Sequence, residues 1–285
     1  SRVELLPTMR DPGIVFRLIM EQMGSVERLS DLLGKFHNLE GIGFGHEMYL
    51  SNQHLRDIEK LKGLKKIWFD YNWDLGKNGL KSLAKIQGLE ELDLHKVLQS
   101  SKEPEVLEYF SSCSSLRHVA VSIGKLNAQI LKHLSKIRSL NSVRFDHWYI
   151  CEARDDVPGD FWRELANCEN LRRLEFDAEV LSQQKTQGTI PDIRNVEELS
   201  IFGMVEDHAL LWFLEKMPVL KKLQLTLPKG SVSSCLSRLP ETPPLVSIDL
   251  GDTELDDKDE QYMSARFPFM TKIGRRFFHH QDKNS

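Results

Sequence analysis

The chain has 285 residues, of which 40% are hydrophobic and 28% are charged, as in an ordinary globular protein. Its formal net charge of -4 and its pI near 6.2 disfavour a nucleic-acid partner, because proteins that bind DNA or RNA usually carry a basic stripe. No apolar run approaches the roughly 20 residues that cross a bilayer, so we expect no membrane span.

Residues 1–35 are predicted to form an N-terminal partial repeat and a capping helix. Val3 to Pro7 matches the last half of the strand motif described below, which favours a chain that begins inside a repeat of a longer protein. Pro12 to Phe36 predicts one helix, because Pro12 suits a first helical turn and apolar residues follow it at helical spacing. These apolar residues are Val15, Leu18, Ile19, Met23, Val26, Leu29, Leu32 and Leu33.

One motif then occurs nine times: an apolar residue, two variable positions, an apolar residue, one variable position and an apolar residue. Alternate residues of a strand point to opposite faces, so the last two apolar positions are predicted to be buried and the variable positions to line the other face. One such strand cannot bury its apolar edge alone, whereas stacked copies build a parallel sheet with a continuous core. The copies begin at Leu39, Leu64, Leu89, Leu116, Leu140, Leu171, Val196, Leu220 and Leu245.

The segments between the motifs are predicted to be mostly helical, because apolar residues recur there at steps of three and four. Leu55, Ile58 and Leu61 step in this way after the first motif. Cys113 and Cys168 occupy a position where most other repeats place Leu, Ile or Met, which predicts buried cysteines rather than reactive ones. Two tryptophans outside the motifs, Trp162 and Trp212, are predicted to pack within helices.

The repeated pattern and its spacing resemble the leucine-rich repeat. The resemblance covers about Phe36 to Arg275 and implies an α/β fold: a horseshoe-shaped solenoid with a parallel β-sheet on its concave face and mostly helices on its convex face. Many members of this superfamily place Asn or Cys three positions after the motif, and here only Asn72 fits. Such irregular repeats are similar to those of intracellular NLR-type immune receptors and of F-box substrate adaptors.

The repeat array is expected to span residues 36–276, with nine repeats and a degenerate tenth. The tenth copy would be Met270 to Ile273, where Arg275 takes the third apolar position and gives the polar surface that a terminal cap requires. Residues 277–285 are predicted to form a frayed tail in which His279 and His280 are solvated rather than bound to metal.

Variable strand positions carry the residues that we predict to bind a protein ligand on the concave face. Trp, Tyr and Arg, the types that dominate binding hot spots, are prominent in the second and fifth motifs. The alternative is a structural role, since Trp148 lies beyond its motif and Phe202 can stack on a neighbour. The longest repeat adds a charged loop, residues 151–160, which is predicted to be solvated or to form a binding rim. The predicted binding residues are Trp68, Asp70, Tyr71, Asp93, His95, His118, Arg144, Asp146, His147, Trp148, Arg173 and Glu175.

Signatures of catalysis are missing from the sequence. There is no phosphate-binding loop, no serine-hydrolase elbow and no zinc-protease helix, so we predict neither an enzyme nor a cofactor. The four cysteines have no metal-ligand spacing. His95, His118 and Asp146 could approach one another, but strands about 4.8 Å apart bring polar groups together on any such surface.

The resemblance implies a non-catalytic recognition module: the C-terminal ligand-sensing domain of a larger intracellular receptor of the NLR type, with further domains upstream. One alternative is the substrate-binding domain of an F-box ubiquitin ligase adaptor, although Pro12 to Phe36 is too short for the three helices of an F-box. Another is a repeat-type GTPase-activating protein, for which Arg144 would be the candidate catalytic residue. The lack of cysteine-rich caps and of an apolar signal segment predicts a cytoplasmic location.

Overall fold

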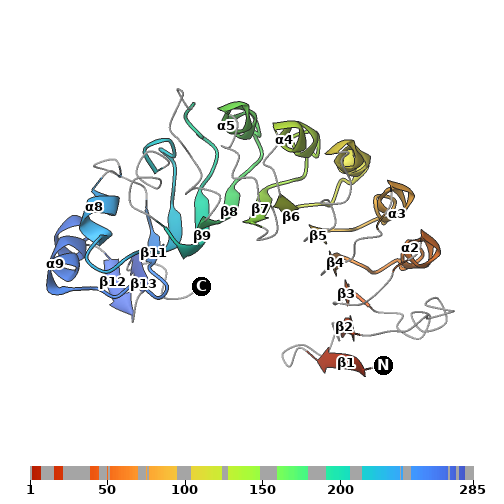
Figure 1. Ribbon diagram of the computed structural model, residues 1–285, viewed down its shortest axis with the longest axis horizontal. Helices are drawn as coiled ribbons and strands as arrows, with labels where there is room; N and C mark the ends of the chain where they lie inside the picture. Colours follow the sequence, from red (N-terminus) through yellow and green to blue (C-terminus); the bar gives the residue numbers. More distant parts are fainter. Residues whose placement is uncertain are drawn as a thin grey trace. The chain divides into compact units, whose positions relative to one another are not determined.

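The computed structural model divides the chain into an N-terminal unit, Ser1–Cys151, and a C-terminal unit, Glu152–Ser285. In each unit, short strands alternate with helices along the chain (Figure 1). The structure describes residues 2–7, 16–21, 39–44, 50, 52–69, 75, 77–94, 104–123, 128–147, 159–178, 191–205, 214–237, 239, 245–268, 270–273 and 276–279.

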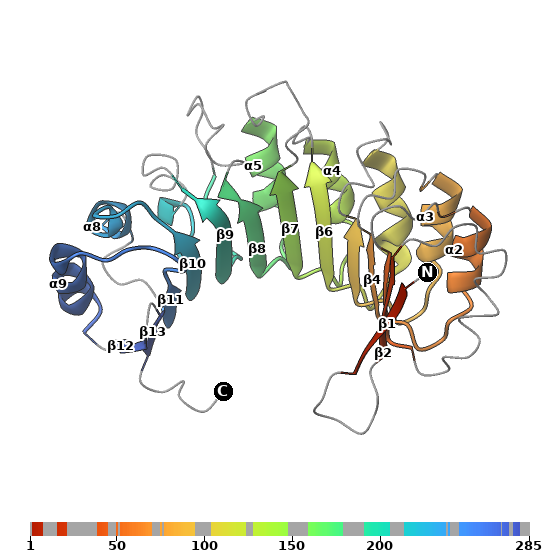
Figure 2. The same cartoon turned by 60° about the horizontal axis from the view of Figure 1, so that its bottom comes forward.

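The sheet of the N-terminal unit is parallel from its second strand onward, and its strands are hydrogen-bonded in chain order (Figure 2). Leu92 lies opposite Val119, and Val119 lies opposite Val143, so the motifs stack in the predicted register. The strands are β1 (Arg2–Pro7), β2 (Phe16–Glu21), β3 (Gly41–Phe44), β4 (Lys66–Phe69), β5 (Glu91–Leu94), β6 (His118–Ile123) and β7 (Ser142–His147).

Helices of this unit follow the parallel strands and lie on one side of the sheet (Figures 1 and 2). Leu55 and Ile58 are buried, which confirms the helical spacing read from the sequence. Among the helices that the structure describes, none has the length and apolar character needed to cross a membrane. The helices are α2 (Asn52–Ile58), α3 (Lys77–Leu83), the 3-10 helix η1 (Pro104–Ser112) and α4 (Ala128–Leu134).

The C-terminal unit repeats the arrangement with four parallel strands, β8 to β11. Its helices are α5 before β8, α8 between β10 and β11, and α9 after β11 (Figure 1). The strand bounds are β8 (Arg173–Asp177), β9 (Glu198–Met204), β10 (Lys222–Thr226), β11 (Ser247–Asp249), β12 (Met270–Ile273) and β13 (Arg276–His279). The helix bounds are α5 (Gly159–Ala166), α8 (Val232–Leu236) and α9 (Asp257–Arg266).

Apolar motif positions form the core of each unit, as the alternation predicts. Phe44 and Phe69 of neighbouring repeats stack with their ring centroids 5.2 Å apart. Trp162 is fully buried, 5.1 Å from the ring of Phe161 and 5.8 Å from that of Phe176, so its predicted packing role is confirmed. Trp212 lies outside the described residues.

Successive repeats within each unit are joined by the same backbone contact, which seven of the nine motifs make at their second position. The carbonyl of Glu40 accepts hydrogen bonds from the N–H groups of Lys65 at 2.8 Å and Lys66 at 2.9 Å. The carbonyl of Arg172 accepts from those of Glu197 at 2.8 Å and Glu198 at 2.9 Å. The carbonyls that make the same pair of bonds elsewhere are those of Lys65, Glu90, Arg117, Glu197 and Lys221.

The prediction of one N-terminal helix over residues 12–36 is wrong in the part of this segment that the structure describes. Phe16–Glu21 forms β2, which pairs parallel with β3 and antiparallel with β1. The first repeat strand would otherwise present unpaired N–H and C=O groups at the edge of the sheet, and a strand satisfies them where a helix cannot. Val3 to Pro7 does lie in a strand, but its antiparallel direction differs from that of a repeat strand.

The C-terminal end differs from the sequence prediction in a similar way. Met270–Ile273 forms a strand, but β13 rather than this tenth copy lies beside β11, and it does so antiparallel. The tail predicted to be frayed is therefore ordered from residue 277 to 279. Phe277 and Phe278 favour a strand, which covers the open edge of β11.

Replacing Leu174 by Asp should destabilise the C-terminal unit, because Leu174 is fully buried on β8, in register with Leu199 of β9. Loss of a buried leucine costs about 2–5 kcal/mol, and a carboxylate without a partner in the core adds to this. Chemical denaturation should show a free energy of unfolding lower by at least about 3 kcal/mol. Gln224→Asp, on the exposed side of β10, is the matched control, and equal stability of the two variants would contradict the assignment of Leu174 to the core.

Candidate functional site

The candidate site is the variable strand face, which we define as the surface formed in each unit by the strand side chains that alternate with the buried apolar ones. Six of the predicted binding residues have described side chains: Trp68, Asp93, His118, Arg144, Arg173 and Glu175. Asp146 and His147 belong to β7, but their side chains are outside the described part. Asp70, Tyr71, His95 and Trp148 lie wholly outside it.

Three of these residues share one row across the N-terminal unit. Gly43, Trp68, Asp93, Ala120 and Arg144 follow one another in register from β3 to β7. Trp68, Asp93 and Arg144 are partly exposed, whereas Ala120 between the last two is buried.

Trp68 lies across the backbone of the neighbouring strand β3. A Cβ atom added to Gly43 would overlap Nε1 and Cε2 of the indole and would lie 2.6 Å from its Cζ2. A Cβ atom added to Gly41 would be 3.3 Å from Cζ3. The ring therefore covers both glycines, and the absence of side chains at these two positions is what allows the close approach.

Side chains at the start of the same strands are paired with one another. Lys66 Nζ donates to Glu91 Oε1 at 2.7 Å. His118 Nδ1 is hydrogen-bonded to Ser142 Oγ at 2.8 Å. The predicted grouping of His118 with His95 and Asp146 involves side chains outside the described residues, so it stays a prediction.

The C-terminal unit pairs its charges in the same manner. Arg173 Nε and Glu175 Oε1 are 2.8 Å apart, and Glu175 is buried. Lys222 Nζ and Glu198 Oε1 are also 2.8 Å apart, across β9 and β10. Two residues predicted to contact a ligand, Arg173 and Glu175, thus neutralise each other within one strand.

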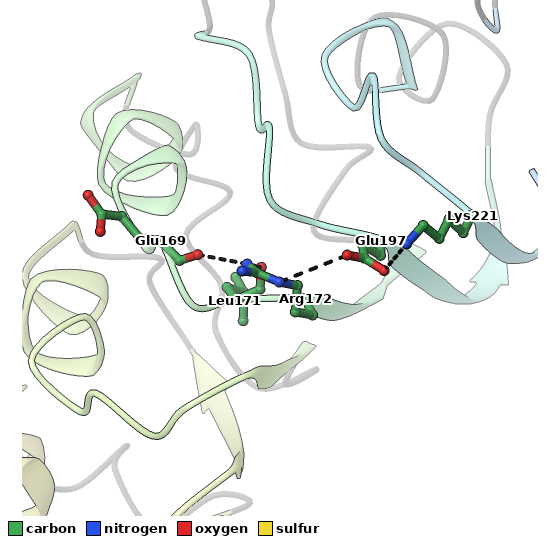
Figure 3. Close-up of polar contacts among 5 residues, drawn as sticks. All are labelled: Glu169, Leu171, Arg172, Glu197 and Lys221. Atoms are coloured by element: carbon green, nitrogen blue, oxygen red, sulfur yellow. Dashed lines mark hydrogen bonds and ion pairs between the residues drawn. The ribbon is translucent and has the colours of Figure 1, made fainter. Parts of the chain in front are cut away.

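The second motif position adds a ladder of alternating charge along the edge of the C-terminal unit (Figure 3). Lys221 Nζ donates to Glu197 Oε2 at 2.6 Å, and Arg172 Nε lies 4.0 Å from the other carboxylate oxygen. The guanidinium of Arg172 also donates to the carbonyls of Glu169 at 2.7 Å and Leu171 at 3.2 Å. The hydrogen bond from Lys221 lowers the pKa of Glu197, so this carboxylate stays ionised.

The equivalent pair in the N-terminal unit is Lys65 and Glu40. Lys65 Nζ donates to Glu40 Oε1 at 2.8 Å, and this bond raises the pKa of the lysine. Both groups are partly exposed to solvent, where an ion pair adds little to stability. The charge ladder therefore determines which side chains pair with each other, and it contributes little to the free energy of unfolding.

Comparison with known proteins supports the architecture. No family model and no curated protein matches the chain. Among solved structures, one of a TLR13–ssRNA13 complex covers 87% of this chain at 16% identity with a TM-score of 0.53. This chain has the leucine-rich-repeat fold.

This leucine-rich-repeat chain spans 34% of the TLR13 chain that it matches. An internalin from Listeria monocytogenes is 14% identical over 85% of this chain and 62% of its own, with a TM-score of 0.39. A structure of the Toll–Spatzle complex from Drosophila is 12% identical over 84% of this chain and 43% of its own, with a TM-score of 0.27. The TLR13 match, at 16% identity, supports the fold alone and does not identify a ligand.

Two thiol groups of the leucine-rich repeats, those of Cys113 and Cys168, lie in surroundings that disfavour the reactive thiolate form. Cys113 is buried and its Sγ donates to the carbonyl of Ala84 at 3.1 Å. Burial raises the pKa of Cys113 to about 11, and burial together with Glu164 raises that of Cys168 to about 12. The prediction of packing cysteines is confirmed for Cys113, whereas Cys168 is partly exposed. Within the described part of the chain, no group of His, Cys, Asp and Glu side chains could hold a metal ion.

Sequence reasoning missed the part that glycine plays at this site. The signal was present in the first motif, where Gly41 and Gly43 take both variable positions of the strand. No other motif has glycine at either position, and a strand without side chains on its variable face leaves room for a ring from the next repeat. Only the side-chain geometry shows that Trp68 supplies this ring.

Replacing Gly43 by Ala should displace the indole of Trp68, because the new methyl group would occupy the position of the ring. Such overpacking typically costs about 1–3 kcal/mol. The indole N–H resonance of Trp68, assigned by its loss in Trp68→Phe, should shift in NMR spectra. Gly63→Ala is the control, since its Cβ would make an ordinary contact 3.7 Å from the carbonyl of Leu39. An unchanged resonance in Gly43→Ala would show that the ring lies elsewhere.

Cys113 and Cys168 should resist modification by a thiol reagent in the folded chain. At pH 8 a thiol with a pKa of about 11 is ionised in only about one molecule in 1,000, and the thiolate is the reactive form. Peptide mapping by mass spectrometry after treatment with a disulfide reagent should find both unmodified, and both should react in denaturant. Modification of either at the rate of a free thiol would contradict their packing.

Proposed function

We propose that this leucine-rich-repeat chain is a non-catalytic recognition module that binds another protein through the variable strand face of its N-terminal unit. One observation supports this most directly: Trp68, Asp93 and Arg144 share a row across strands that are fixed to one another by backbone hydrogen bonds. A row with an aromatic ring, a carboxylate and a guanidinium presents three kinds of contact in a fixed order. Arg and Trp are enriched among residues that dominate binding energies.

Rigidity of the row adds to its value for recognition. The indole of Trp68 rests on Gly41 and Gly43, so binding would not have to restrict its rotation. A preorganised ring buries a large area at a low cost in conformational entropy. The charges at the strand starts, such as Lys66 and Glu91, already pair with each other.

A protein is favoured over a nucleic acid as the ligand. The TLR13 structure to which this chain is similar is a complex with single-stranded RNA, but a formal net charge of -4 gives this chain no excess of basic residues to neutralise phosphates. A role as a GTPase-activating protein ranks last, because it would need a catalytic side chain that projects into a bound nucleotide site, and Arg144 is the single candidate that the sequence offers for it.

The biological setting that we favour is the C-terminal ligand-sensing domain of a larger cytoplasmic receptor of the NLR type. Its support is the irregularity of the repeats, which the substrate-binding domains of F-box adaptors share. The sequence of the full-length protein separates the two settings. A nucleotide-binding P-loop upstream would favour the sensor, and a three-helix F-box would favour the adaptor.

Trp68→Ala should weaken binding of a partner, obtained by pull-down with the full-length protein, by roughly 1–3 kcal/mol. Calorimetric titration would measure the loss, and Tyr71→Ala, outside the described residues, tests whether the site extends along the repeat. Lys132→Ala, exposed on α4, is the control that should bind normally. Trp162→Ala should instead lower stability, because its ring is fully buried.

Unchanged affinity of a folded Trp68→Ala variant would exclude the N-terminal row as the binding site. Equal losses in Trp68→Ala and Lys132→Ala would point to a general effect on the fold. The charged loop of residues 151–160 would then be the next surface to test.

A further inference from the structure

Helices α2 and α3 of the N-terminal unit, together with the turns that end them, carry an excess of positive charge. Residues 52–62 and 77–86 contain six basic and two acidic side chains, whereas the whole chain has a formal net charge of -4. The two helices pack side by side on the helical side of the sheet (Figures 1 and 2). All six basic residues are exposed, and we name them the basic helix patch: Arg56, Lys60, Lys62, Lys77, Lys81 and Lys85.

The two acidic residues of this surface each meet one of the six basic ones. Lys60 Nζ donates to Asp57 Oδ1 at 2.9 Å. Glu59 Oε1 lies 3.4 Å from Lys85 Nζ, and this ion pair joins the turn after α2 to the turn after α3. With both acids counted, the two helices and their turns still carry a formal charge of +4, since six basic residues stand against two acidic ones.

Helix stability does not account for the charges on α3. A basic residue in the last turn suits the helix dipole, as Arg56 does in α2 and Lys81 does in α3. Lys77, however, is the first residue of α3, where a positive charge opposes the dipole, and neither helix has an acidic residue in its first turn. Lys77, Lys81 and Lys85 follow at steps of four, so they share one face and repel one another. Exposed charges that cost stability indicate a role in binding.

Acidic residues border the basic helix patch. The 3-10 helix η1, which packs against α3, has two acidic residues and no basic one, and its Glu108 accepts from Lys136 of α4 at 2.5 Å. The strand starts beside the turns hold three acidic and two basic residues, and both basic ones are paired there. Beyond η1, α4 and the turn that ends it are basic again. The bordering charges are Glu40, Lys65, Lys66, Glu90, Glu91, Glu105 and Glu108, and those beyond η1 are Lys132, Lys136 and Arg138.

Size and charge together limit what fits the basic helix patch. From Lys77 to Lys85 the helix rises about 12 Å, a distance that an extended chain covers with about four residues. Charges attract strongly within the Debye length, about 8 Å at physiological salt, so a segment of this size is affected mainly by the patch itself. A long polyanion such as RNA, or an anionic membrane, would also meet the acidic border and a chain whose net charge is -4.

We propose that the basic helix patch binds a short acidic segment of a protein partner, with about three or four Asp or Glu residues in sequence. The inference goes beyond the proposed function, because this surface lies on the helical side of the sheet and not on the variable strand face. Carboxylates placed along α3 pair with its lysines and remove their mutual repulsion. Capture of acidic motifs by clusters of basic side chains is a recurrent mode of peptide recognition.

The test is fluorescence anisotropy of a fluorescein-labelled octapeptide with four consecutive glutamates, titrated with the full chain at low salt. The peptide should bind, with an affinity that falls as salt is added, and the same peptide with four glutamines should not. The double variant Lys77→Gln/Lys81→Gln should weaken binding by about fivefold, because two exposed ion pairs are lost. Lys229→Gln/Lys258→Gln, exposed in the C-terminal unit, is the matched control: it removes the same charge and should bind like the parent.

Equal weakening by the two double variants would show a response to net charge alone and would overturn the proposal, as would a glutamate peptide that does not bind. Tighter binding of an eight-nucleotide RNA or of phosphatidylserine vesicles, lost in Lys77→Gln/Lys81→Gln, would overturn the choice of a protein segment. A glutamate peptide that responds to Trp68→Ala instead would lie on the variable strand face, which leaves the proposed function intact and removes this second site. Circular dichroism of Lys77→Gln/Lys81→Gln should match that of the parent, because both side chains are exposed.

Discussion

Everything on the variable strand face depends on one repeated hydrogen-bond pair. The backbone carbonyl at the second motif position accepts from two consecutive N–H groups of the next repeat, as Glu40 does from Lys65 and Lys66. Both bonds must form at once, so a strand cannot slide along its neighbour by one residue without losing them. Within each unit this pair of hydrogen bonds fixes the register between adjacent motifs. The register in turn decides the row to which each variable side chain belongs.

The fixed register explains why opposite charges alternate at the second motif position. Second-position residues of adjacent repeats lie side by side, and like charges there would repel. Glu40 with Lys65, and Glu197 with Lys221, alternate instead. Side chains held in such pairs stabilise the spacing of the repeats and contribute little recognition of their own.

How far the sequence predicts this structure depends on which contacts are local to a repeat. The apolar alternation identifies the strands, the buried positions and the helices such as α2, because each repeat signals them separately. The hairpins at β1 and β13 were not predicted, since the need to cover a strand edge is a property of the sheet and not of its residues. The support of Trp68 by Gly43 was missed for the same reason: the two residues belong to different repeats and meet only when these stack.

Because Trp68 and Gly43 are in contact, the substitutions that can accumulate at these two positions during evolution depend on each other. A side chain at Gly43 is compatible with the fold only if the indole has first been exchanged for something smaller, and a smaller residue at position 68 leaves the β3 backbone open to water. Substitutions at the two sites are therefore tolerated in one order and resisted in the other. Among descendants of this sequence, tryptophan at the second repeat should occur only together with glycine at the first.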